Sequence, residues 1–128
     1  MIPITIGNYE ENALVDTGSE ISCISSEYLD SHPLIFSDMM RLPLVKVSIR
    51  VAINKSTIQP KQQIYLPITI NNLTFDYPFI IVPNLNNKII IGADFAKHFW
   101  ATIDFKNNTV SFNDNQLNKG VSVNFIRL

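Results

Sequence analysis

Apolar and polar residues alternate with a period of two in several stretches of the chain. Residues 2–6 show this pattern clearly, and Gly7-Asn8 predicts a tight turn after them. Similar short runs, separated by Asn-rich and Pro-containing segments, predict further strands. They lie at residues 12–15, 21–25, 65–70, 73–82, 89–91, 101–105, 109–112 and 121–126. The pattern therefore predicts an all-β protein.

One helix is expected near the C-terminal end, at residues 94–100. Phe95, Phe99 and Trp100 fall on one side at helical spacing, and Asp94 stands at the start. Residues 26–31 are expected to form one helical turn or a loop. The following segment, residues 31–41, is expected to be an irregular connection.

A long hairpin is predicted in the middle of the chain. Residues 45–53 alternate strictly, and residues 58–64 follow across the polar turn Asn54-Lys55-Ser56. Its two faces differ little in polarity, which is typical of an arm that projects from the body of a protein. A plain surface hairpin is the alternative.

A carboxylate follows an apolar run in residues 13–19, Ala-Leu-Val-Asp-Thr-Gly-Ser. At the end of a buried strand Asp16 would be costly unless it is hydrogen-bonded, neutralised or shared. Asp16 could open a tight turn, with Gly18 at positive φ and Ser19 capping the next segment. It could instead be half of an aspartic-protease dyad that shares a proton and activates a water. A second apolar element ending in Gly, residues 89–94, favours the dyad, because Gly92 would let that strand lie against the motif loop.

These two elements together resemble the retropepsins, the aspartic proteases of retroviruses and long-terminal-repeat retrotransposons. Leu-Val-Asp-Thr-Gly-Ser and the downstream Ile-Ile-Ile-Gly-Ala-Asp-Phe carry the resemblance, which extends over residues 2–105. It implies a closed β-barrel or sandwich with one short C-terminal helix. At 128 residues the chain forms one domain and is too short for two catalytic lobes, so the resemblance implies a homodimer.

The resemblance assigns roles to the motif residues. Asp16 is the catalytic residue, and Thr17 is a scaffold whose hydroxyl bonds to the partner's loop. Gly18 lets the substrate backbone approach. A Ser19 hydroxyl donating to the Asp16 carboxylate would favour its ionised form and move the working range toward acid. No cofactor or metal is expected.

The resemblance also implies where an extended polypeptide substrate binds. Glu20 would contact the substrate main chain, and the central hairpin would be the flap, with its tip near residues 51–55. Leu14, Ile53, Ile89 and Ile91 would form apolar pocket walls. The expected substrate-binding residues are Leu14, Gly18, Glu20, Ala52, Ile53, Asn54, Ile89 and Ile91. The flap differs from the family pattern in having no glycine at its tip.

The C-terminal extension, residues 106–128, is expected to supply strands at the dimer interface. The N-terminal interface strand of compact viral relatives is expected to be missing, so the contact would be rebuilt from these strands. Unpaired strand edges of this kind otherwise invite association.

Composition narrows the function classes. The net charge is −1 and there is no Lys/Arg cluster, so nucleic-acid binding is not expected. The lone Cys23 is expected in the core. No apolar run reaches the length of a membrane span, and no signal sequence is recognised, so we expect an intracellular protein, cytoplasmic or within retroelement particles. His98 lacks a second His or Cys at ligand spacing, so we interpret it as a partly exposed residue and Trp100 as a core or interface residue.

Three functions stay open from the sequence. The first is a retroelement protease that cleaves its polyprotein, or a host gene descended from one. The second is a host-protein protease like the DNA-damage-inducible family. The third is a catalytically silent, dimeric peptide-binding or assembly domain. The flap without glycine favours the third function, whereas the intact Asp16-Thr17-Gly18 argues against it.

Overall fold

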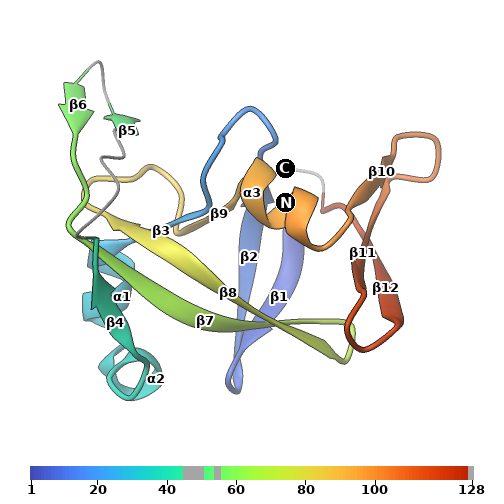
Figure 1. Cartoon of the computed structure of the whole chain (residues 1–128), viewed down its shortest axis with the longest axis horizontal. Helices are drawn as coiled ribbons and strands as arrows, with labels where there is room; N and C mark the ends of the chain where they lie inside the picture. The colour runs from blue at the N-terminus through green and yellow to red at the C-terminus, as the bar shows by residue number, and fades with distance from the viewer. Residues whose placement is uncertain (45–50, 54–55, 127–128) are drawn as a thin grey trace.

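A closed six-stranded β-barrel forms the body of the protein in a computed structural model, which describes residues 1–44, 51–53 and 56–126 (Figure 1). Each strand pairs with the next, and the last pairs back to the first. In order around the barrel the strands are β1 (Ile2–Ile6), β2 (Tyr9–Val15), β9 (Ile89–Ile91), β3 (Cys23–Ser25), β8 (Leu73–Val82) and β7 (Gln62–Ile70). The predicted all-β, closed-barrel class is confirmed.

The described residues form three short helices, so the expectation of a single helix was wrong. They are α1 (Ser26–Ser31), α2 (Pro33–Phe36) and α3 (Ala93–His98). The side chain of Ser25 caps α1 by accepting a hydrogen bond from the Tyr28 amide at 3.2 Å. Pro33 begins α2, where its missing N–H costs nothing. Helices of four to six residues are too short to show a helical period in the sequence.

None of the helices in the described parts of the chain is long and apolar enough to cross a membrane.

The long central strand β7 organises one side of the barrel. Its C-terminal half pairs with β1, and its N-terminal half pairs with β4 (Arg41–Pro43), a strand that the sequence did not indicate. Every second residue of β7 points into the core. Those residues are Ile64, Leu66, Ile68 and Ile70, and they pack with an aromatic cluster of Phe75, Phe79, Phe95, Phe99 and Phe112.

The predicted central hairpin is present but shorter on its second arm. β5 (Val51–Ile53) pairs with β6 (Ser56–Ile58), with Ile53 opposite Ser56. Residues from Gln62 onward belong to β7 instead, because that apolar run is buried between β4, β1 and β8. The predicted arm at 45–50 and the turn residues 54–55 lie outside the described residues. In Figure 1 the hairpin projects from the barrel.

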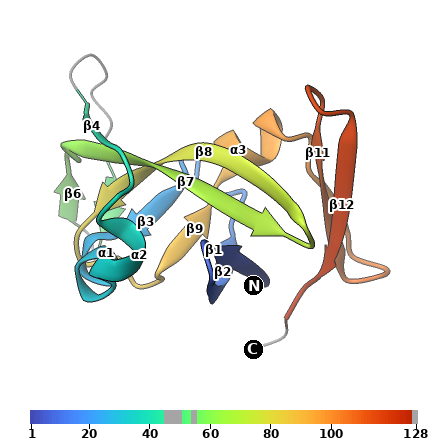
Figure 2. The same ribbon diagram turned by 90° about the horizontal axis from the view of Figure 1, so that it is seen from below.

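The chain continues after α3 into a three-stranded sheet. Its strands are β10 (Thr102–Asp104), β11 (Thr109–Asp114) and β12 (Lys119–Asn124). Figure 2 shows this sheet standing at one end of β7 and β8. Val110, Phe112 and Val123 point from it into the barrel core. One face of the extension is therefore buried within the chain, and a role for the sheet in a dimer stays a prediction.

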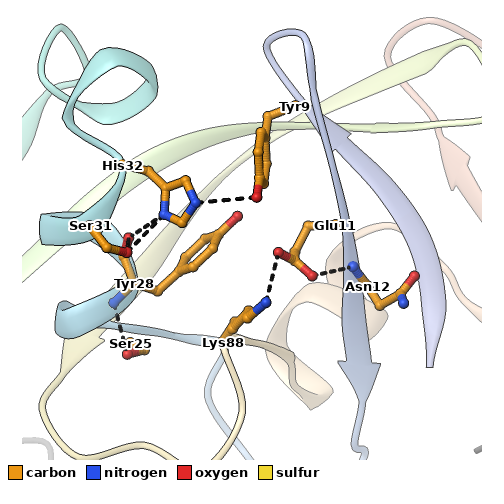
Figure 3. A network of polar contacts seen from close by, with 8 residues as sticks. All are labelled: Tyr9, Glu11, Asn12, Ser25, Tyr28, Ser31, His32 and Lys88. Atoms are coloured by element: carbon orange, nitrogen blue, oxygen red, sulfur yellow. Dashed lines mark hydrogen bonds and ion pairs between the residues drawn. The ribbon is translucent and has the colours of Figure 1, made fainter.

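A polar network ties α1 to strand β2 (Figure 3). The Nε2 of His32 lies 3.2 Å from the hydroxyl of Tyr9, and its Nδ1 lies 3.0 Å from the carbonyl of Tyr28. Next to them, Lys88 donates to Glu11 at 3.3 Å. Burial, reinforced by the Glu11 carboxylate, raises the pKa of Tyr28. Because β2 carries Tyr9 and Glu11, these contacts hold the strand that leads to Asp16.

Cys23 is a buried core residue, as predicted. It begins β3 and pairs with Ile80 on one side and Ile90 on the other. Burial, with a smaller contribution from the charge of Asp94, raises the pKa of its thiol to about 11.

We expect the Cys23 thiol to react slowly while the protein is folded. At pH ~8 a pKa shift from 9.0 to about 11 lowers the reactive thiolate fraction about a hundredfold, and burial adds a steric barrier. Alkylation by iodoacetamide, followed by mass spectrometry with and without denaturant, measures the difference. Equal rates in both conditions would contradict the buried placement.

Gly92 is expected to be indispensable for stability. A Cβ at this position would lie 2.7 Å from the carbonyl carbon of Ile21 and 2.8 Å from the carbonyl oxygen of Ser19, and a shift of the loop backbone would strain the hydrogen bond from the Ala93 amide to the Ser19 carbonyl. Gly92→Ala should therefore lower the free energy of unfolding by about 3 kcal/mol or more, measured by urea denaturation. Gly120→Ala is the matched control, because its Cβ would meet mainly the end of the Asn113 side chain, which can rotate away.

Candidate active site

Asp16 directly follows β2 and is held by the backbone around it. Its amide donates to the Ile91 carbonyl at 3.0 Å, and its own carbonyl accepts from the Ser19 amide at 3.1 Å. The Gly18 amide donates to the Asp16 Oδ1 at 3.0 Å. These three bonds set both the position of the residue and the orientation of its carboxylate.

The segment that follows β9 supports the rest of the motif loop. The Ala93 amide donates to the Ser19 carbonyl at 2.7 Å, and the Asp94 amide donates to the Glu20 carbonyl at 3.2 Å. The two backbones can come this close because Gly92 has no side chain, which confirms its predicted role. The loop and the start of α3 thus form one hydrogen-bonded unit.

Ser22 is a buried supporting residue that the sequence did not reveal. Its hydroxyl donates to the Asp94 Oδ1 at 2.7 Å and accepts from the Gly92 amide at 2.9 Å. Asp94, expected only as the first residue of the helix, therefore also anchors the loop. A hydroxyl between the apolar residues Ile21 and Cys23 was the available signal, because a buried hydroxyl needs a partner.

Asp16 is exposed in the single chain, which corrects the expectation of a buried carboxylate. The side chain lies beyond the end of β2, where the barrel stops and no other part of the described chain covers it. In Figure 1 the loop after β2 and the β5–β6 hairpin rise from the same side of the barrel. One carboxylate is thus presented at the surface by a rigid support.

Two details of the motif differ from expectation. The Ser19 hydroxyl donates to the Ile21 carbonyl at 2.8 Å, so it is directed into its own loop and not toward the Asp16 carboxylate. Gly18 does not adopt the positive φ that the tight-turn alternative required, and a Cβ there would lie 3.1 Å from the Asp16 Oδ1. Thr17 and Glu20 are exposed, so their predicted contacts with a partner or a substrate stay predictions.

Two of the four predicted apolar wall residues lie in the core, and the role of Leu14 and Ile53 stays a prediction. Ile89 and Ile91 are 0% exposed and belong to the core, so they do not line an open surface. The residue between them, Ile90, is half-buried and lies beside the half-buried Leu14 across the parallel β2–β9 pair. Side chains alternate along a strand, so Ile90 is the residue of β9 on the outer face, and the sequence analysis missed it.

Of the three residues predicted to bind substrate from the central hairpin, the structure describes the backbone of two. Ala52 and Ile53 lie in β5, whereas Asn54 is outside the described residues. Their contact with a substrate stays a prediction.

No metal-binding cluster of three or more His, Cys, Asp or Glu occurs among the described residues. The imidazole ring of His98 packs on two aromatic rings, with centroid distances of 4.7 Å to Phe99 and 5.4 Å to Tyr77. Trp100 does not lie in the core, because it is 64% exposed.

Comparison with known proteins agrees with this geometry. The family model described as retroviral aspartyl protease matches residues 3–118. No curated protein sequence matches the chain. The crystal structure of the retroviral protease-like domain of Ddi1 from Leishmania major is similar, with a TM-score of 0.68 and 21% sequence identity over 98% of this chain and 88% of that one. This likeness concerns the fold, whereas the family match covers most of the sequence. The chain therefore belongs to the retroviral aspartyl protease family.

Proposed function

We propose that this protein is an aspartic endopeptidase that works as a homodimer. The observation that supports the proposal most directly is the Asp16 carboxylate, exposed at the barrel surface and oriented by the Gly18 amide. A single carboxylate lacks the partner that the chemistry needs, and the chain holds only one Asp-Thr-Gly motif. A second copy supplies that partner.

In the proposed mechanism two Asp16 side chains face each other across a two-fold axis. Two carboxylates in close contact do not both ionise, so the pair holds one proton. The ionised member takes a proton from a bound water, which attacks the scissile carbonyl carbon. The protonated member donates to the developing oxyanion. When the tetrahedral intermediate breaks down, the carboxyl group that took the water proton donates it to the leaving amine nitrogen. The other carboxylate accepts a proton from a hydroxyl of the intermediate, so the pair again holds one proton.

The substrate is proposed to be an extended polypeptide with bulky apolar side chains next to the cleaved bond. Leu14 and Ile90 support this choice, because both are half-buried neighbours on adjacent strands at the end of which Asp16 stands. The β5–β6 hairpin is the proposed flap over the peptide. A retroelement polyprotein, processed inside the cell or within its particles, is the proposed natural substrate.

A host-protein protease is the second candidate. Its support is the similar fold of the Ddi1 domain, which is a likeness of structure and not of substrate. Both candidates share the same chemistry, whereas a silent peptide-binding domain would keep the dimer and lack turnover.

Asp16→Asn should abolish peptide cleavage. The amide cannot act as a general base, so we expect the rate on a peptide library at pH ~5 to fall by a factor of about a thousand or more. Pepstatin should inhibit the wild-type protein. Mass spectrometry of the library identifies the cleaved bonds.

Asp104→Asn is the matched control for this variant. Asp104 also accepts backbone hydrogen bonds from residues that follow it, at 3.0 Å from Lys106 and 3.1 Å from Asn107, but it lies outside the motif. Full activity in this control and none in Asp16→Asn would support the protease. Cleavage that survives Asp16→Asn would contradict it, and the lack of any wild-type cleavage would favour the binding domain.

Ser19→Ala should leave the pH optimum of cleavage unchanged. The hydroxyl donates to the Ile21 carbonyl, so its removal takes no hydrogen bond from the Asp16 carboxylate. Loss of that loop bond should lower the free energy of unfolding by about 1 kcal/mol. A pH–rate profile and urea denaturation measure the two effects, and an optimum displaced toward neutral pH would show that the hydroxyl does reach the carboxylate.

A further inference from the structure

A hollow of about 470 Å³ lies beside the motif loop and extends along α3 to the residues that follow the helix. Thr17, the residue after Asp16, forms one part of its wall. Three alanines give it a shallow, mostly apolar floor. The complete lining is Thr17, Ala93, Ala96, Lys97, Trp100 and Ala101.

Trp100 borders this hollow with an exposed aromatic side chain. It is 64% exposed, and the same residue also borders the depression next to the turn that follows β11. An exposed tryptophan next to an apolar hollow is uncommon on a surface that stays in contact with water, because its large apolar area is costly to hydrate.

The backbone holds Trp100 rigidly in this position. Its φ is +49°, which is unfavourable for a residue with a large side chain, so the surrounding structure must maintain it. The Ala101 amide donates to the Ala96 carbonyl at 2.8 Å, and the Asn113 amide donates to the Phe99 carbonyl at 2.6 Å. These bonds fix both neighbours of Trp100 and present its ring outward.

We propose that this surface is the interface between two copies of the chain, and that the Trp100 side chain of each copy packs into the alanine-lined hollow of the other. The proposal rests on the proposed function, because a dyad requires a two-fold axis close to Asp16. A surface that begins at Thr17 is necessarily close to that axis. Contacts across such an axis are made by the same patch on both copies, so the patch must be complementary to itself. An exposed aromatic side chain and a hollow within one patch satisfy this condition.

This placement gives Trp100 a role distinct from the catalytic machinery. It contacts neither substrate nor the reacting atoms, and acts by bringing the two Asp16 residues together. Large aromatic side chains that fill a pocket commonly dominate the free energy of association. Lys97, at the rim, can turn its ammonium group into water while its stem covers apolar surface.

The protein contains a single tryptophan, so Trp100 reports on its own burial. On dilution through the dissociation range, the wild-type emission maximum should move to longer wavelength, and acrylamide quenching should increase. Sedimentation velocity at the same concentrations measures the monomer–dimer equilibrium without any substrate. A dimer that forms while the Trp100 emission stays constant would overturn the proposal.

Trp100→Ala should weaken the dimer by about tenfold or more. Leu34→Ala is the matched control, because Leu34 is also apolar and highly exposed but lies on α2 at a different surface. Ala96→Lys is a second test, since it fills the hollow and keeps the tryptophan. Circular dichroism checks that each variant is folded. If Trp100→Ala does not fold, the dimer affinity of Ala96→Lys tests the proposal in its place. Wild-type affinity in a folded Trp100→Ala or Ala96→Lys, or a wild-type monomer at every concentration, would overturn the proposal.

The activity of the wild-type protein separates this proposal from the protease itself. A dimer that buries Trp100 but cleaves no peptide would refute the proposed function and leave the interface standing. Cleavage by a dimer whose Trp100 stays exposed would refute the interface and leave the protease standing.

Discussion

The structure depends on the direct backbone contact between the motif loop and the segment that follows β9. Four backbone amides donate hydrogen bonds across this contact, those of Asp16, Gly92, Ala93 and Asp94, and the Asp16 amide bonds to Ile91, the last residue of β9. Only Ser22 contributes a side chain as an acceptor, and its hydroxyl is in turn held by the Asp94 carboxylate. Buried backbone groups must be paired, so this contact satisfies the loop and fixes its shape in one step. Gly92 is the residue that makes the distance possible.

The strand pairing of the barrel brings the motif loop and the segment after β9 to the same end of the barrel. β2 and β9 run parallel, so Asp16 and Gly92 emerge at the same end of the barrel. β9 is central, with β3 on its other side, and its inward residues are fully buried. A rigid core under an exposed carboxylate is what a catalytic group needs if its geometry is to be preorganised. The network around His32 and the α1 cap adds support at the opposite end of β2.

The sequence was sufficient for the features that follow from local periodicity and turn chemistry. The β7–β8 hairpin turns at Asn71 and Asn72, as the pattern predicts, and both residues adopt positive φ. Strand β1 has the predicted bounds. The close approach at Gly92 was also predicted correctly, because it depends on the one residue type without a side chain.

The errors concern features that only tertiary packing decides. The inward and outward faces of β9 cannot be told apart in a run of three isoleucines, so Ile89 and Ile91 were chosen instead of Ile90. The direction of the Ser19 hydroxyl depends on the fold of the loop, which places the Ile21 carbonyl within reach. The exposure of Asp16 depends on where the barrel ends. Short helices such as α2 are stabilised by burial of a few side chains, here Phe36, and not by a repeat in the sequence.

The parallel pairing of β2 with β9 has a consequence for the order of events during synthesis. Residues 14 and 15 of β2 can pair with β9 only after residues 90 and 91 have been synthesised. Strand pairings between segments so distant in the chain form slowly. A nascent chain that has emerged only as far as β6 has the Asp-Thr-Gly residues but not the segment that supports them. The motif loop therefore acquires its hydrogen-bonded shape late, after β9 and the start of α3 have been made.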